Sequence, residues 1–134
     1  MKINDVCRGR ILLVDDSPEV LEVFSLCLEE AGYKVSSASN GVSALYAAKL
    51  SKPDAIILDL WMPQLGGMEL AGLLKGDAHL ASVPLGLITA AVGILPRLVT
   101  SSFVAVMAKP CRLDDLLSMA DSLMAKRGQV GLKS

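Results

Sequence analysis

The segment Ile11-Leu12-Leu13-Val14-Asp15-Asp16 sets a pattern that recurs along the chain, because four apolar residues in a row end at charged residues. An uninterrupted apolar run of this length is typical of a strand in a parallel sheet covered on both faces. Three more runs have this character: Ala55-Ile56-Ile57-Leu58, Leu85-Gly86-Leu87-Ile88 and Val104-Ala105-Val106-Met107. A weaker strand, Lys34 to Ala38, alternates in part and is expected at an edge of the sheet.

Helical patterns fill the gaps between these strands. Ser17-Pro18-Glu19 is a helix start with a hydroxyl cap, a proline and an acid, and this helix is expected to run to Ala31. The other helices are expected from Asn40-Gly41 to about Leu50, from about Met68 to Lys75, around Arg97 to Ser101, and from Arg112 onward. Five alternations of strand and helix predict an α/β fold, a doubly wound sandwich with right-handed crossovers.

Composition limits the class of protein. The 134 residues suffice for one domain, and their formal net charge of −1 argues against nucleic acid or an anionic membrane as the main partner. Proline, arginine, serine and threonine interrupt the longest apolar stretch, so no membrane insertion is expected. Three cysteines without a Cys-x-x-Cys spacing fit a cytoplasmic location. The expected divisions are an N-terminal extension (1–9), one domain (10–126) and a loose tail (127–134).

Polar residues follow four of the predicted strands. Asp15 and Asp16 follow the first, Asp59 the third, Thr89 the fourth and Lys109 the fifth. Because ligands bind at the carboxyl ends of strands in open α/β sheets, we expect these groups to meet at one edge. Carboxylates about 4 Å apart repel by roughly 4 kcal/mol at an effective dielectric constant near 20, and Mg²⁺ relieves such repulsion. The Lys109 ammonium leaves room for an anion beside the metal.

Each of these groups alone has a simpler explanation. Asp16 suits a helix cap, Thr89 a turn and Lys109 a solvated surface, whereas Asp59 follows a buried strand and needs a partner. Rival chemistries lack their residues: no G-x-G-x-x-G or G-x-x-x-x-G-K-[ST] motif occurs, and His79, the one histidine, falls in an expected loop.

Together the motifs resemble the receiver domain of bacterial two-component response regulators, of the single-domain, chemotaxis-regulator type. The matching pieces are Val14-Asp15-Asp16, Asp59-x-x-Met62-Pro63 with Gly66 or Gly67 following, Thr89-Ala90 and Lys109-Pro110. The resemblance implies a flavodoxin-like (βα)5 fold whose five-stranded parallel sheet has the order 2-1-3-4-5.

The resemblance also implies roles for the residues. Asp59 would accept a phosphoryl group from a phosphohistidine of a sensor histidine kinase or histidine phosphotransfer protein. Asp16, Asp59 and the backbone carbonyl of Trp61 would bind Mg²⁺, for which Mn²⁺ can substitute, and Asp15 would act mainly through metal-bound water. Thr89 and Lys109 would contact the phosphoryl oxygens. The domain would catalyse its own phosphorylation and dephosphorylation while serving mainly as a signalling switch.

The switch itself departs from the family pattern. Thr89, Ala90 and residue 106 are its expected positions, but residue 106 is Val106 where the family usually has an aromatic residue. A β-branched side chain has little reach, so a ring-flip readout is not expected. The output face would comprise the helix around Arg97 to Ser101, the strand 104–107 and the last helix. It would bind an unknown downstream protein or a second copy in a homodimer.

Other interpretations stay open. The chain is read as a stand-alone switch, but it could also be a receiver module excised from a larger hybrid kinase or transcriptional regulator. A pseudo-receiver that is never phosphorylated and only binds partners is a further alternative. A metal-dependent phosphatase of the haloacid-dehalogenase type would require a second acid two residues after Asp59, where Trp61 stands.

Overall fold

The computed structural model describes residues 7–62, 64–90 and 101–127. Its elements, in chain order, are β1 (Arg10–Val14), α1 (Pro18–Glu30), β2 (Lys34–Ala38), α2 (Gly41–Ser51), β3 (Ala55–Leu58), α3 (Gly67–Lys75), β4 (Leu85–Thr89), β5 (Ala105–Ala108) and α5 (Leu113–Lys126). The predicted helix around Arg97 to Ser101 falls mostly outside the described residues. Within the part that is described, no helix is long and apolar enough to cross a bilayer.

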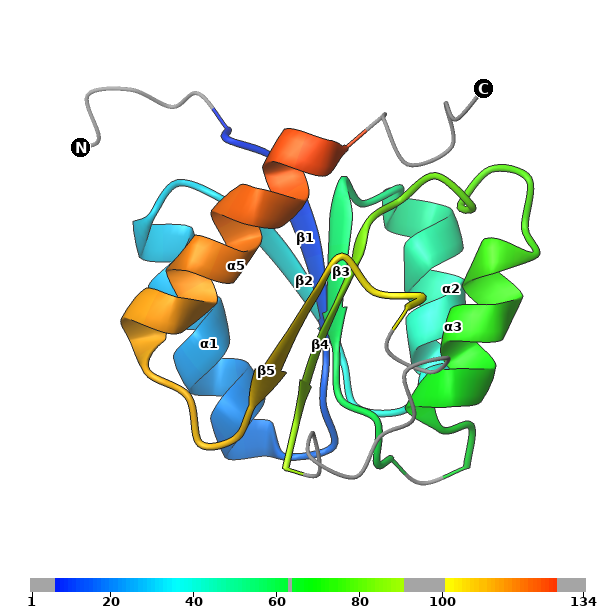
Figure 1. Cartoon of the computed structure of the whole chain (residues 1–134), viewed down its shortest axis with the longest axis horizontal. Coiled ribbons are helices and arrows are strands. Elements are labelled where there is room, and N and C mark those ends of the chain that lie inside the picture. The colour runs from blue at the N-terminus through cyan, green and yellow to red at the C-terminus, as the bar shows by residue number, and fades with distance from the viewer. Residues whose placement is uncertain (1–6, 63, 91–100, 128–134) are drawn as a thin grey trace.

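The five strands form one parallel sheet in the order β2-β1-β3-β4-β5 (Figure 1). The predicted order is confirmed, and so is the edge position of β2. At the carboxyl ends, Val14 of β1 pairs with Ala38 of β2 and with Leu58 of β3. The residues that follow β1, β3 and β5 therefore leave the sheet at the same edge, which is the lower end in Figure 1.

Helices cover both faces of the sheet, with α1 and α5 on one face and α2 and α3 on the other (Figure 1). Successive residues of a strand serve opposite faces: Ile11 and Leu13 pack with the cluster under α1 and α5, and Leu12 and Val14 with the cluster under α2 and α3. From Ile11 to Val14 neither face of β1 is exposed to water, which is why this part of the strand is continuously apolar.

Helix starts agree with the sequence signals. The Ser17 hydroxyl accepts a hydrogen bond from Val20 N at 3.3 Å, and the Asn40 side chain accepts one from Ser43 N at 2.8 Å. The third helix, expected from about Met68 to Lys75, spans Gly67–Lys75. Gly66 N donates to a Glu69 carboxylate oxygen at 3.1 Å, which satisfies a backbone group at this helix end.

Two strand boundaries also differ from the prediction. β5 extends to Ala108 and begins at Ala105, one residue later than the predicted run. Thr89, expected to follow the fourth strand, is its last residue and pairs with Ala108. Its side chain is consequently buried rather than placed in a turn.

Candidate functional site

Asp15 and Asp59 are held at the sheet edge by backbone hydrogen bonds that continue the strand pairing by one residue. Asp15 N donates to Ala38 O at 3.2 Å, and Asp59 N donates to Val14 O at 3.0 Å. Both side chains are buried, with exposed fractions of 4% for Asp15 and 6% for Asp59. Buried carboxylates require charged or hydrogen-bonding partners, so the neighbours of these two residues decide what the site can do.

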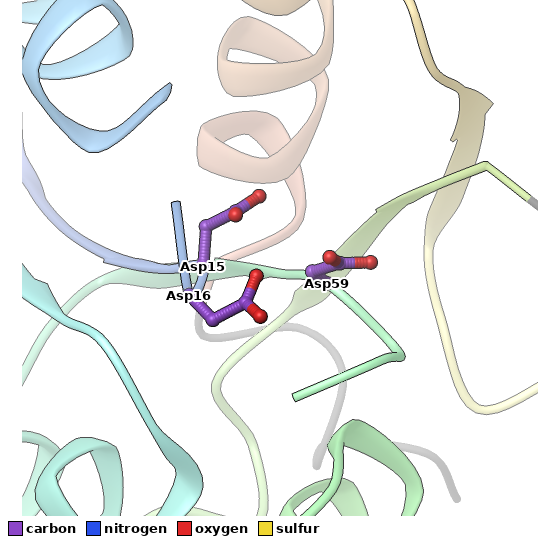
Figure 2. A group of neighbouring side chains, drawn as sticks. All are labelled: Asp15, Asp16 and Asp59. Carbon is purple, nitrogen blue, oxygen red and sulfur yellow. The ribbon is translucent and has the colours of Figure 1, made fainter. Parts of the chain in front are cut away.

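Three carboxylates gather at this edge. Oxygen atoms of Asp15, Asp16 and Asp59 lie within 4.8 Å of one another, and Figure 2 shows the three side chains side by side. At that separation a pair of charges repels by about 3 kcal/mol at an effective dielectric constant near 20. Asp16 is the exposed member of the group.

Lys109 brings the opposing charge. Its ammonium Nζ lies 2.7 Å from Asp15 Oδ2 and 3.2 Å from Asp59 Oδ2, so one cation bridges two of the three carboxylates. Lys109 N donates to Thr89 O at 3.0 Å, which fixes the backbone beside the last residue of β4. In the structure, Asp15 Oδ2 accepts a hydrogen bond from this lysine, and its expected role through metal-bound water stays a prediction.

Burial and neighbouring charges shift the pKa values of both Asp59 and Lys109. Burial raises the pKa of Asp59 and the Asp15 charge adds to the increase, although Lys109 and the Trp61 backbone N–H act in the opposite direction. Burial alone would lower the pKa of Lys109, but its hydrogen bonds and charge interactions with Asp15 and Asp59 outweigh this effect and raise it. A cation bound beside Asp59 would favour the ionised form of its carboxylate.

Thr89 is completely buried, and its Oγ1 atom makes no hydrogen bond with any residue in the described ranges. A buried hydroxyl without a partner costs about 1–3 kcal/mol relative to one that is hydrogen-bonded. The next residue, Ala90, is exposed. Thr89 therefore has an unused donor at the same sheet edge as the acids.

The segment between β3 and α3 borders the site. Trp61 N approaches Asp59 Oδ1 at 3.5 Å, and the Trp61 side chain is 58% exposed. A Cβ atom on Gly67 would lie 2.5 Å from the carbonyl oxygen of Asp59, so only glycine permits this close contact. The sequence left open whether Gly66 or Gly67 matters, and Gly67 is the one that contacts Asp59. Pro63 of the same motif lies outside the described residues.

Two supporting residues were not recognised from the sequence. Ser17 was read as a helix cap only, but its backbone N–H also donates to Asp15 Oδ1 at 2.9 Å. Gly41 lies against the segment after β3, where a Cβ atom would approach Leu65 O to 2.2 Å. The Asn40-Gly41 pair was a visible signal for a helix start, but the close approach depends on tertiary structure.

Residues 103 and 106 belong to the core that α2 and α3 cover. Val106 is half-buried and packs against this core, and the Phe103 ring is part of it. His79 lies in the segment between α3 and β4, as expected, at the other end of the sheet. The histidine is thus remote from Asp59.

The donor set fits a divalent cation with a preference for oxygen. Three carboxylates and one ammonium carry a formal charge of −2 when all are ionised, and carboxylate oxygens are the usual protein ligands of Mg²⁺. The ligand group found among the described residues consists of carboxylates alone, without the thiolate or imidazole that softer metals prefer.

The family model described as the response regulator receiver domain matches residues 11–121. The chain belongs to this family. The resemblance inferred from the sequence is therefore confirmed, and membership supports a phosphoacceptor role in two-component signalling. Receiver domains bind Mg²⁺ at an acidic pocket and generally pair with histidine kinases and downstream targets.

Among curated proteins, the chain is similar to the DNA-binding dual master transcriptional regulator RpaA of Synechocystis sp., with 29% identity over 123 residues. That alignment covers 90% of the chain but 51% of RpaA, so the chain spans about half the length of this relative. It is also 36% identical over 81 residues to Protein PilH of Pseudomonas aeruginosa, which covers 60% of the chain and 67% of PilH.

Solved structures of receiver domains share the fold. The chemotaxis response regulator CheY4 of Vibrio cholerae superimposes with a TM-score of 0.80 at 26% identity, covering 86% of this chain and 98% of CheY4. The response regulator TrrA of Thermotoga maritima, solved in complex with Mg²⁺ and BeF, gives a TM-score of 0.77 at 31% identity. That match covers 85% of this receiver domain and 97% of TrrA.

Proposed function

We propose that this receiver domain is a Mg²⁺-dependent switch in which Asp59 accepts a phosphoryl group from a phosphohistidine. The observation that carries the proposal is the position of the Asp59 carboxylate, which lies 3.2 Å from the Lys109 ammonium and within 4.8 Å of two other carboxylates. An aspartate with a purely structural role would need only one hydrogen-bonding partner. Here the carboxylates that could hold a cation and the ammonium that could contact a phosphoryl oxygen lie together.

In the transfer, an oxygen of Asp59 attacks the phosphorus atom. A P–O bond forms, the P–N bond to the donor histidine breaks, and the electron pair of that bond stays on the imidazole nitrogen. Positioning and charge neutralisation carry most of the catalysis in such reactions. Bound Mg²⁺ would supply positive charge beside the phosphoryl oxygens, held by Asp16, Asp59 and the backbone carbonyl of Trp61, with Asp15 contributing indirectly.

Lys109 and Thr89 would receive the product. The ammonium of Lys109 already bridges Asp15 and Asp59, so it is in place to contact a phosphoryl oxygen once Asp59 carries an acyl phosphate. The Thr89 hydroxyl, which lacks a partner among the described residues, would donate to another oxygen and gain the hydrogen bond it lacks. The movement of Thr89 toward the phosphoryl group would then displace the backbone at Ala90. Val106 has no aromatic ring that could reorient in response.

The partners follow from the same proposal. The donor would be a sensor histidine kinase or a histidine phosphotransfer protein, and the output would be a downstream protein that binds the face of β5 and α5. We also propose that the receiver unit comprises residues 10–126. Two copies of it would form a homodimer through this face. The chain covers 51% of the DNA-binding relative RpaA. The second candidate function is therefore that of a receiver module in a larger regulator.

A direct test is to incubate the protein with acetyl phosphate and Mg²⁺ and to weigh the intact chain by mass spectrometry. One phosphoryl group is expected on the wild-type protein and none on Asp59→Asn. Asp114→Asn, which removes an exposed carboxylate at the start of α5, serves as the matched control and is expected to be modified like the wild type. The absence of a mass gain in the wild type would favour the pseudo-receiver instead.

A further inference from the structure

A cavity of about 480 Å³ lies at the opposite end of the sheet from the acidic cluster, in the region where the strands begin (the upper end in Figure 1). The end of α2, Pro53 before β3 and the segment between α3 and β4 border it, and it is open to solvent. Its lining residues are Lys49, Lys52, Pro53, Asp77, His79, Leu80 and Val83. The volume falls within the range of small-molecule sites, roughly 300–1,000 Å³.

The inner wall of this cavity is apolar. Pro53 and Leu80 are buried and Val83 is half-buried. Leu80 and Val83 also contact the core that α2 and α3 cover, so the wall is part of the rigid fold. Small-molecule sites combine such a wall with a few polar groups that fix the orientation of the ligand.

Two cations stand at the rim. Lys49 and Lys52 are exposed, and neither forms an ion pair with any residue that the structure describes. Asp77, the acid of the cavity, accepts a hydrogen bond from His79 N at 2.8 Å. Asp54, close in sequence, accepts one from Arg10 N at 2.8 Å and lies 3.8 Å from Arg127. Neither carboxylate forms an ion pair with Lys49 or Lys52 in the described part of the chain, so both lysines can contact a ligand.

The backbone of Lys52 is unusual. This residue ends α2 in the left-handed conformation, with φ 50° and ψ 65°. Glycine is the common residue for that conformation, and a lysine adopts it at a steric cost. Lysines near a helix end can simply interact with its terminal carbonyl groups, and Lys49 alone would suffice for that. A second lysine on a strained backbone, at the rim of a cavity, calls for a further reason.

We propose that this cavity binds a small amphiphilic anion. An aromatic or branched apolar body would lie against Pro53, Leu80 and Val83, and a carboxylate, sulfonate or phosphate group would contact Lys49 and Lys52. The proposal is independent of phosphoryl transfer at Asp59, because the two sites lie at opposite ends of the sheet and share no residue.

The test uses naphthalene-1-sulfonate as the probe, titrated into the full chain and followed by the backbone amide resonances of Leu80 and Val83. Saturable shifts of these two amides are expected. Inorganic sulfate has the charge without the apolar body, and 1-naphthol has the apolar body without the charge, so each is expected to bind at least tenfold more weakly. Equal binding of either control compound would overturn the amphiphilic assignment.

Variants locate the charge contacts. Lys49→Gln and Lys52→Gly are each expected to weaken probe binding by about tenfold, because each removes one charge-assisted contact. Lys52→Gly also relieves the left-handed backbone, so thermal unfolding is expected at or above the wild-type temperature. Lys34→Gln removes an exposed lysine outside the cavity and should bind the probe like the wild type. The proposal fails if the titration shows no saturation, or if both cavity variants match Lys34→Gln.

Discussion

Replacing Asp16 with asparagine tests whether the three carboxylates form one metal site. Asp16 is exposed and makes no hydrogen bond or ion pair with any residue of the described part, so without metal its charge mainly repels its neighbours. Repulsion from Asp15 persists in the unfolded chain, because the two residues are adjacent. The term specific to the folded state is therefore the repulsion between Asp16 and Asp59.

That term can be estimated from the separation of up to 4.8 Å between the carboxylate oxygens. Coulomb's law gives about 1 kcal/mol at the dielectric constant of water, and this limit suits the exposed Asp16. Asp16→Asn is thus expected to raise the free energy of unfolding by about 1 kcal/mol in the presence of EDTA. With Mg²⁺ at ten times its Kd, the wild type gains about 1.4 kcal/mol, whereas the variant should gain little.

The assay is urea unfolding followed by circular dichroism, with EDTA or with Mg²⁺. Trp61, the single tryptophan, lies beside Asp59 and reports Mg²⁺ binding separately through its fluorescence. Glu22→Gln removes one exposed negative charge from α1 and serves as the control. The reasoning is refuted if Asp16→Asn is no more stable than this control in EDTA, or if it retains the full gain from Mg²⁺.

Three further predictions concern stability, each measured by urea unfolding. Lys109→Met should destabilise the metal-free protein by about 3 kcal/mol, because it leaves two buried carboxylates without their cation, and Mg²⁺ should restore part of this loss; an unchanged midpoint would contradict the bridge. Gly41→Ala should lower the free energy of unfolding by about 1–3 kcal/mol, because the new Cβ would meet Leu65 O at 2.2 Å. The control Gly72→Ala has open space around the new Cβ and should stabilise α3 by about 0.5–1 kcal/mol. Equal effects of the two substitutions would disprove the close approach at Gly41. Burial, aided by a hydrogen bond to a carboxylate of α5, raises the pKa of Tyr33 to about 12 from 10.0. The protonated phenol therefore contributes about 2–3 kcal/mol to the free energy of unfolding below pH 10, and this contribution is lost between pH 10 and 12. Tyr33→Phe should lack this decline in stability, and a decline as large as that of the wild type would contradict the assignment.

The sequence predicted the sheet because β1, β3 and β4 are apolar on both faces, a pattern with few structural solutions. It also predicted that acids and a lysine leave the sheet at one edge, because the rule for parallel strands depends on chain direction alone. The order of the strands needed the family resemblance, since continuous apolarity does not distinguish a central strand from its neighbours.

Other features of the site depend on distances that no sequence pattern encodes. That Lys109 bridges Asp15 and Asp59, instead of facing solvent, follows from the pairing of β4 with β5 and from the backbone hydrogen bond to Thr89. The burial of Thr89 follows from its place as the last paired residue of β4, which a boundary prediction readily misses by one residue.

The glycine at position 67 has a consequence for how the protein can change by mutation. The backbone of Asp59, the proposed phosphoacceptor, rests on the first turn of α3 with no space for a methyl group, whereas Trp61, two residues later, exposes most of its surface to water. We therefore expect substitutions of the Trp61 side chain to change the surface beside Asp59 without displacing the Asp59 carboxylate. The exposed Trp61 side chain is thus free to vary during evolution, while position 67 is restricted to glycine.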